Sequence, residues 1–187
     1  IVDDYLESYF RTFPTRATAA GRHEYDAELE DLSSEARDAW LALNQATAER
    51  IEPALAAGDL EPELARDLEL LLRQAERQIM DYGTLDRPGS YPLYWTGILG
   101  NATVFLLVRD HLPAAERLDS ATRRATAIPR LAAQAIEALE GSGDRMAPEH
   151  CEMAARQAPG TARFYRQGFA EAAGEDDELR ERMTAAG

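Results

Sequence analysis

Apolar residues recur along this chain at spacings of three and four, which is the period of an amphipathic helix. The first stripe occupies residues 2–13 and stops at Pro14, because a proline disfavours helical backbone in the residue before it. Its members are Val2, Tyr5, Leu6, Tyr9, Phe10 and Phe13. The pattern predicts an N-terminal helix that must bury an aromatic face.

Two longer helices are predicted next. Serine is a favoured helix cap and glycine a favoured residue just past a helix end, so one helix begins at Ser33-Ser34 and closes at Gly58. The other runs from Pro62, a favoured first position, to Gly83. Its buried stripe is predicted to consist of Leu64, Leu68, Leu71, Leu72, Ala75 and Ile79.

Residues 88–108 contain no charged side chain, which raises the question of a membrane span. A spanning helix needs about 20 predominantly apolar residues. This run instead contains prolines, glycines and polar residues, and its purely apolar part is only Val104 to Val108. We therefore expect a helix that is buried by other helices, ends near His111 and makes no contact with a membrane.

The rest of the chain continues the helical pattern. Pro113 is predicted to open a further helix, which Pro129 either kinks or divides. Residues 148–174 are expected to form one or two helices divided near Pro159-Gly160. The apolar stripe after Pro129 is predicted to be Leu131, Ala135, Ile136 and Leu139, and the inward aromatic residues of the last segment are predicted to be Phe164, Tyr165 and Phe169.

The sequence as a whole therefore predicts an all-α fold, a multi-helix bundle of about seven helices with short connections. No internal repeat and no long linker divides residues 1–187. They are expected to form either a single helical domain or the N-terminal helical region of a longer protein.

The composition of the chain restricts its expected partners and location. The net charge is −14, from 34 acidic residues and 20 arginines with no lysine, a bias that favours a high-GC or salt-adapted bacterial source. An acidic surface repels phosphate backbones, so we expect no nucleic-acid partner. The first residues lack the basic and apolar regions of a signal peptide, and a cytoplasmic location is favoured over secretion.

The candidate chemistry is sparse. His23-Glu24 is the first half of the HExxH signature, in which histidines at i and i+4 bind zinc from one helical turn, but the i+4 residue here is Ala27. Neither His111 nor His150 has a companion at helical spacing. The single cysteine, Cys151, excludes an internal disulfide, and adjacent His150 points away from it on a helix. The sequence therefore predicts no catalytic residue and no metal ligand in this chain.

One group of residues has a recognisable pattern, P-x-x-A-T-x-x-G-x-x-x-Y-D-x-x-L-x-D-x-S. Its members are Pro14, Ala17, Thr18, Gly21, Tyr25, Asp26, Leu29, Asp31 and Ser33. Together with "PLYW" at residues 92–95 and "IPRLAAQAIEAL" at 128–139, this signature resembles the N-terminal region of a large bacterial family called domain of unknown function 885. Within it, Gly21 is expected to allow a positive φ and Tyr25 to anchor the loop against the bundle.

The resemblance implies a mostly helical, zincin-like metallopeptidase whose HExxH helix and further acidic ligand lie in its later part. No residue of this chain corresponds to those ligands, so any zinc cofactor belongs to the parent protein and none to this chain. The resemblance thus implies a non-catalytic N-terminal region that acts as scaffold and substrate-cleft wall. The alternative is a free-standing helical binding or protein-interaction module without enzymatic activity.

The resemblance also suggests partners for this region. They are the remainder of the parent polypeptide and peptides, with self-association through apolar surface that the parent normally covers. The candidate peptide contacts are Tyr91, Tyr94 and Trp95, for which ordinary core packing is the competing interpretation.

Overall fold

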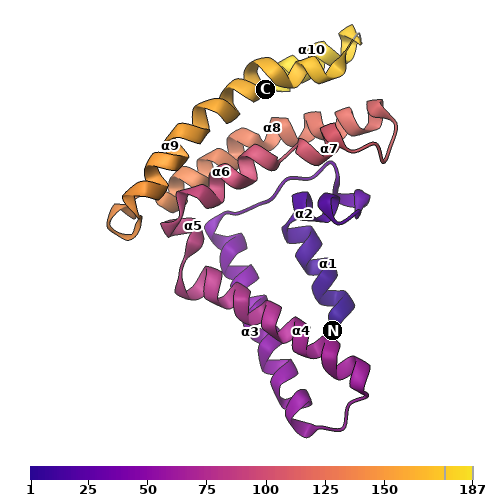
Figure 1. Ribbon diagram of the computed structural model, residues 1–187, viewed down its shortest axis with the longest axis vertical. Coiled ribbons are helices and arrows are strands. Elements are labelled where there is room, and N and C mark those ends of the chain that lie inside the picture. Colours follow the sequence, from indigo (N-terminus) through magenta and orange to yellow (C-terminus); the bar gives the residue numbers. More distant parts are fainter. Residues whose placement is uncertain (175, 187) are drawn as a thin grey trace.

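The computed structural model describes residues 1–174 and 176–186, and every regular element within them is a helix (Figure 1). The all-α prediction is confirmed. The α-helices are α1 (Val2–Thr12), α2 (Pro14–Ala19), α3 (Ser34–Ala57), α4 (Pro62–Ile79), α5 (Arg87–Ser90), α6 (Pro92–Asn101), α7 (Val104–Val108), α8 (Ala114–Leu139), α9 (Pro148–Arg163) and α10 (Asp177–Ala186). Short 3₁₀ or π turns occupy His23–Tyr25, Met80–Thr84, Gly143–Arg145, Phe164–Gly168 and Phe169–Ala173.

The helix boundaries follow local signals in the first half of the chain. α1 ends one residue before Phe13-Pro14, and α2 begins with that proline. The Ser33 hydroxyl accepts a hydrogen bond from the Ala36 amide at 3.3 Å and caps α3, which ends where Gly58 adopts a φ of +72°. These ends are therefore set by short-range chemistry that the sequence displays.

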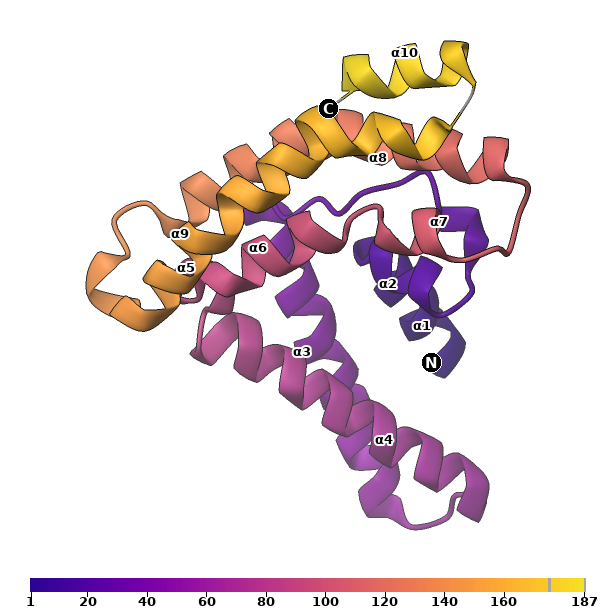
Figure 2. The same cartoon turned by 45° about the horizontal axis from the view of Figure 1, so that its top comes forward.

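The helices form two groups (Figures 1 and 2). α3 and α4 lie side by side as a helical hairpin that extends to one end of the molecule, and α1 packs on α4. At the other end α6 and α9 pack together, α8 lies against both α6 and α7, and α10 covers α8. The signature segment, from α2 to the start of α3, crosses between these two groups.

Two apolar clusters hold these groups together. The larger joins α1, α3, α4, α6 and α8, and at its centre the rings of Phe13 and Trp40 meet edge to face at 5.3 Å. Within it, the buried Trp40 indole donates a hydrogen bond to Gln78 at 2.9 Å. The smaller cluster joins α7, α8, α10 and the turns after α9, and it includes Leu106, Leu118, Ala121, Ala125, Tyr165, Phe169, Leu179 and Met183.

The uncharged segment differs from its prediction. After the short helix α5, it forms two helices, α6 and α7, which are separated at Ala102-Thr103, and α7 ends at Val108 rather than near His111. The Ala102 carbonyl accepts a hydrogen bond from the Arg124 guanidinium at 2.9 Å, which is a tertiary contact in the place of a helical one. Across the residues that the structure describes, no helix has the length and apolar character that crossing a membrane requires.

The structure decides between the alternatives left open at the two prolines: neither Pro129 nor Pro159 divides its helix. α8 continues through Pro129, and α9 continues through Pro159 to a π turn that begins at Phe164. The buried face of α8 continues on both sides of Pro129, and α9 packs along α6, so this packing outweighs the hydrogen bond that a proline removes.

Three residues of the predicted apolar stripes are exposed, and the first of them is Leu6 of α1, which is 43 % exposed. Leu64 is 45 % exposed because it lies in the first turn of α4, at the outer end of the α3–α4 hairpin. Ile136 is 70 % exposed because it follows buried Ala135 directly, and neighbouring residues of a helix point about 100° apart.

Candidate functional site

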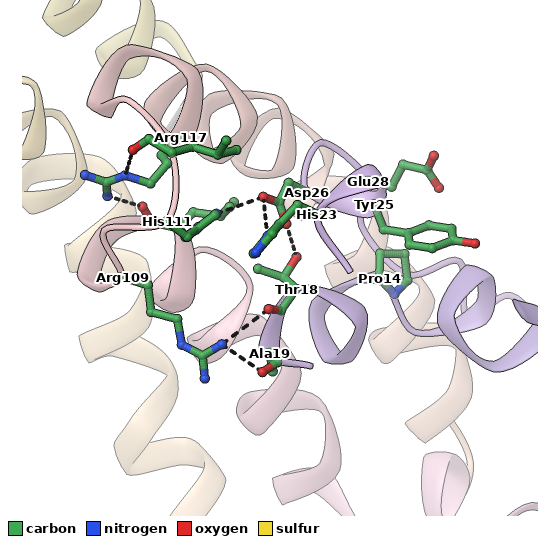
Figure 3. Close-up of polar contacts among 12 residues, drawn as sticks. Pro14, Thr18, Ala19, His23, Tyr25, Asp26, Glu28, Arg109, His111 and Arg117 are labelled. Atoms are coloured by element: carbon green, nitrogen blue, oxygen red, sulfur yellow. Dashed lines mark hydrogen bonds and ion pairs between the residues drawn. The ribbon is translucent and has the colours of Figure 1, made fainter. Parts of the chain in front are cut away.

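Two histidines and an aspartate from distant parts of the chain meet beside the signature segment (Figure 3). The Asp26 Oδ2 atom lies 3.2 Å from Nδ1 of His23 and 3.1 Å from Nε2 of His111. The two imidazole rings are stacked, with their centroids 3.9 Å apart and their planes 13° apart. One potential ligand atom of each residue lies within 4.8 Å of the other two, and we call these residues the His-Asp-His cluster.

The first two members of the cluster are placed by the turn that follows α2. Gly21 adopts a φ of +86°, as the sequence predicts, and reverses the chain so that the Arg22 amide donates to the Ala17 carbonyl at 2.9 Å. His23–Tyr25 then forms a 3₁₀ turn. Tyr25 is buried, and its hydroxyl donates to Glu7 on α1, a hydrogen bond that lowers the pKa of that carboxyl. The turn is thereby fixed on α1.

The third member comes from the loop between α7 and α8. Arg117 of α8 holds this loop, because its guanidinium donates to the carbonyls of Leu106 at 2.7 Å and Leu112 at 3.0 Å. Arg109 ties the loop to α2 through the Ala19 carbonyl at 2.7 Å. His111 is thus brought to Asp26 although 85 residues separate them.

A buried arginine on α8 organises the backbone around the cluster. Arg124 is 1 % exposed, and burial lowers the pKa of its guanidinium. Its five hydrogen bonds end on the carbonyls of Glu28 (2.7 Å), Ala102 (2.9 Å), Tyr25 (3.1 Å) and Pro14 (3.2 Å) and on the Thr18 hydroxyl (2.6 Å). The signature segment is therefore wrapped around one cation.

The same contacts orient the carboxylate of the cluster. Thr18 accepts from Arg124 and donates its hydroxyl proton to Asp26 Oδ1 at 2.6 Å. Asp26 is 3 % exposed, so its position is set by this relay rather than by solvent. Nδ1 of His111 is also buried but has no hydrogen-bond partner among the described residues.

A separate groove lies between α2 and the α6–α7 segment. It has a volume of about 420 Å³ and is lined by Thr15, Arg16, Ala19, Tyr94, Gly97, Ile98, Asn101 and Phe105. We call it the α2–α6 groove. It adjoins the signature because three of its residues belong to α2 or the turn after it.

Arg16 is the cation of the α2–α6 groove. Its guanidinium donates to the Tyr9 hydroxyl at 2.9 Å and lies 4.7 Å from the centre of the Phe13 ring. The side chain is exposed, and no described carboxylate is close enough to form an ion pair with it. Nearby, burial raises the pKa of Tyr94 to about 12, and its hydroxyl shares a 2.7 Å hydrogen bond with that of Tyr82.

The three aromatic residues that the sequence selects lie in three different environments. Tyr94 lines the α2–α6 groove. Tyr91 lines another hollow, of about 430 Å³, and meets the His150 ring edge to face at 4.7 Å. Trp95 is 2 % exposed and donates its indole N–H to the Pro88 carbonyl at 2.8 Å, which makes it part of the core. The structure brings only Tyr94 to the groove beside the signature.

Comparison with known proteins identifies the family. A family described as "Bacterial protein of unknown function (DUF885)" matches residues 14–187. The chain belongs to this family. The DUF885 match begins at Pro14, the first residue of the signature, so the family resemblance read from the sequence is confirmed. Comparison with curated proteins and with solved structures gave no match.

Two residues that shape the His-Asp-His cluster were not predicted from the sequence. Arg124 sits on the buried face of α8 between Ala121 and Ala125, and a charge within a stripe of small residues was the available signal. No sequence pattern indicated His111, because its contact with Asp26 depends on how the α7–α8 loop packs on the signature turn.

Proposed function

We propose that this chain is the non-catalytic helical region of a zinc-dependent peptidase and that the α2–α6 groove forms part of the wall of its peptide cleft. Membership of the DUF885 family supports this assignment through the zincin-like character that the family resemblance implies. In this proposal the HExxH helix and its zinc belong to another part of the parent protein.

The observation that carries the proposal is the free cation in the groove. Arg16 lines the groove, and no carboxylate of the described residues lies within ion-pair distance of its guanidinium, which donates instead to the Tyr9 hydroxyl. A guanidinium binds carboxylates through a fixed fork of N–H donors. Arg16 is therefore suited to hold a carboxylate that comes from outside the chain.

The other lining residues define the rest of the ligand. Ile98 and Phe105 offer apolar surface, and the exposed Asn101 offers an amide oxygen because its NH₂ group already donates to Gly97 at 2.8 Å. A peptide segment with an apolar side chain next to a carboxylate matches this combination. Tyr94 supplies an aromatic wall whose hydroxyl stays protonated at neutral pH, since burial raises its pKa to about 12.

The isolated chain allows a direct test with matched peptides. We expect peptides that have a free carboxylate to shift the nuclear magnetic resonance signals of Ala19, Gly97 and Ile98, and the same peptides as C-terminal amides to shift them much less. Arg16→Ala should remove this difference. Arg73→Ala is the control, because Arg73 is an exposed arginine on the far α3–α4 hairpin. Equal binding of acid and amide by the wild type would contradict the role of Arg16.

A second candidate is a helical protein-interaction module, which one observation favours. Leu70 is 67 % exposed and, with Leu6 and Leu71, it lines an apolar hollow of about 300 Å³ between α1 and α4. Clustered apolar side chains of this kind are typical of a docking surface. The two candidates differ in whether the parent protein cleaves peptides.

A further inference from the structure

We propose that His23, Asp26 and His111 bind one divalent transition-metal ion, with Zn²⁺ as the best match, and that the ion fastens the signature turn to the α7–α8 loop. This inference is independent of the proposed peptidase role, because it uses neither the α2–α6 groove nor a catalytic zinc elsewhere in the parent. The sequence gives no hint of this site, because 85 residues separate Asp26 from His111.

The distances within the cluster suit a shared ion. Zinc binds nitrogen and carboxylate oxygen at about 2.0 to 2.2 Å, so ligand atoms at the corners of a tetrahedron lie about 3.3 Å apart. The two nitrogen atoms of the cluster lie 3.1 and 3.2 Å from Asp26 Oδ2. An ion can therefore replace the two hydrogen bonds without a large movement of the backbone.

The ligand types and their surroundings also fit. Two imidazoles and one carboxylate form a ligand set typical of zinc, and three protein ligands leave one position for water or a further group. The Thr18 hydroxyl holds the second oxygen of Asp26 at 2.6 Å, and such outer contacts orient a carboxylate for a metal. The His23 side chain is about one-third exposed, with 33 % of its surface open, so an ion can reach the cluster from solvent.

Two features set the expected strength of binding. The rings are nearly parallel, so their in-plane lone pairs do not converge until one ring turns, and exposed His23 is the ring that is free to do so. Nδ1 of His111 has no hydrogen-bond partner in the part of the chain that the structure describes, and loss of such a partner typically weakens metal binding about 10–100-fold. We therefore expect micromolar affinity, weaker than that of a structural zinc finger.

Titration of the purified chain with Co²⁺ and Zn²⁺ tests the site. Co²⁺ should give one equivalent of visible absorption bands typical of low-coordinate cobalt, and Zn²⁺ should displace it. Zinc at about 100 times its dissociation constant should raise the midpoint of thermal unfolding by roughly 5 to 10 °C. His23→Ala and Asp26→Asn should abolish both effects.

His150→Ala is the matched control, because His150 is the remaining histidine and lies outside the cluster, against Tyr91. It should leave binding and the thermal shift unchanged. The proposal is overturned if the wild type shows neither effect, or if His23→Ala keeps both while remaining folded by circular dichroism. Because His23 is partly exposed, that variant is expected to fold and decides the matter even where His111→Ala does not fold.

Discussion

At the scale of single residues, Arg124 does most to define the signature segment. A buried charge is tolerated only when its donors are satisfied, and here five acceptors from four segments of the chain satisfy them. The signature residues that the sequence displays, such as Pro14, Thr18 and Tyr25, are therefore arranged around a side chain that lies outside the signature.

Arg124→Ala should destabilise the fold severely. It leaves buried carbonyl groups without donors, and each such group costs about 1–3 kcal/mol, so we expect a loss of at least about 3 kcal/mol in the free energy of unfolding. Urea denaturation followed by circular dichroism measures it. The adjacent Arg123 is exposed and pairs with Asp119 at 3.1 Å, so Arg123→Ala should cost no more than about 1 kcal/mol. Similar losses in both variants would contradict the organising role of Arg124.

The site could be predicted from the sequence only in part. Asp26 belongs to the signature, and Gly21 indicated the turn on which it lies, but the sequence predicted no metal ligand and His23 was not expected to be one. The meeting with His111 could not be predicted, because it depends on Arg109 and Arg117 holding a loop from another part of the chain. Of the three selected aromatic residues, Trp95 is core and Tyr91 lies elsewhere, since a hydrophobic pattern cannot tell a groove from a core.

At the scale of elements, capping residues and glycines determine the helix ends in the first half of the chain. Tertiary contacts determine them in the second half. Ser33 and Gly58 bound α3 as expected. The division between α6 and α7 was not visible in the sequence, because Ala102 gives its carbonyl to Arg124. Pro129 and Pro159 do not end their helices, because packing along α8 and α9 outweighs one lost hydrogen bond.

The stripe of α4 makes a direct test of the hairpin. Leu68 and Leu71 are 4 % and 7 % exposed, so Leu68→Ala and Leu71→Ala should each lower the free energy of unfolding by about 2–5 kcal/mol. Leu70 on the same helix is 67 % exposed, and Leu70→Ala should change it by less than about 0.5 kcal/mol. Equal effects at all three positions, measured by urea denaturation, would mean that the buried face of α4 is wrongly assigned.

At the scale of the whole molecule, two features point outward. One is the α2–α6 groove, whose Arg16 forms no ion pair with the described residues, and the other is the apolar hollow between α1 and α4. The first suits a peptide and the second suits a helix or another protein surface. They are the two surfaces through which we propose that this helical region contacts a peptide and the remainder of a larger protein.

Gly97 offers a precise way to close the groove. A Cβ atom placed on it meets no atom within 4 Å, so Gly97→Leu should be accepted by the backbone, extend into the groove and raise the helix propensity. Gly160 on α9 has equally free space and lies outside the groove, which makes Gly160→Leu the matched control.

Peptide hydrolysis by the full-length parent protein is the measurement that tests the central claim most directly. The account predicts cleavage that a zinc chelator abolishes, a fall in kcat/KM of at least about ten-fold, or about 1.4 kcal/mol, in Gly97→Leu and Arg16→Ala, and wild-type activity in Gly160→Leu. Wild-type activity in all three variants would contradict the cleft-wall role. A parent protein without chelator-sensitive cleavage would contradict the peptidase assignment itself and favour the interaction module.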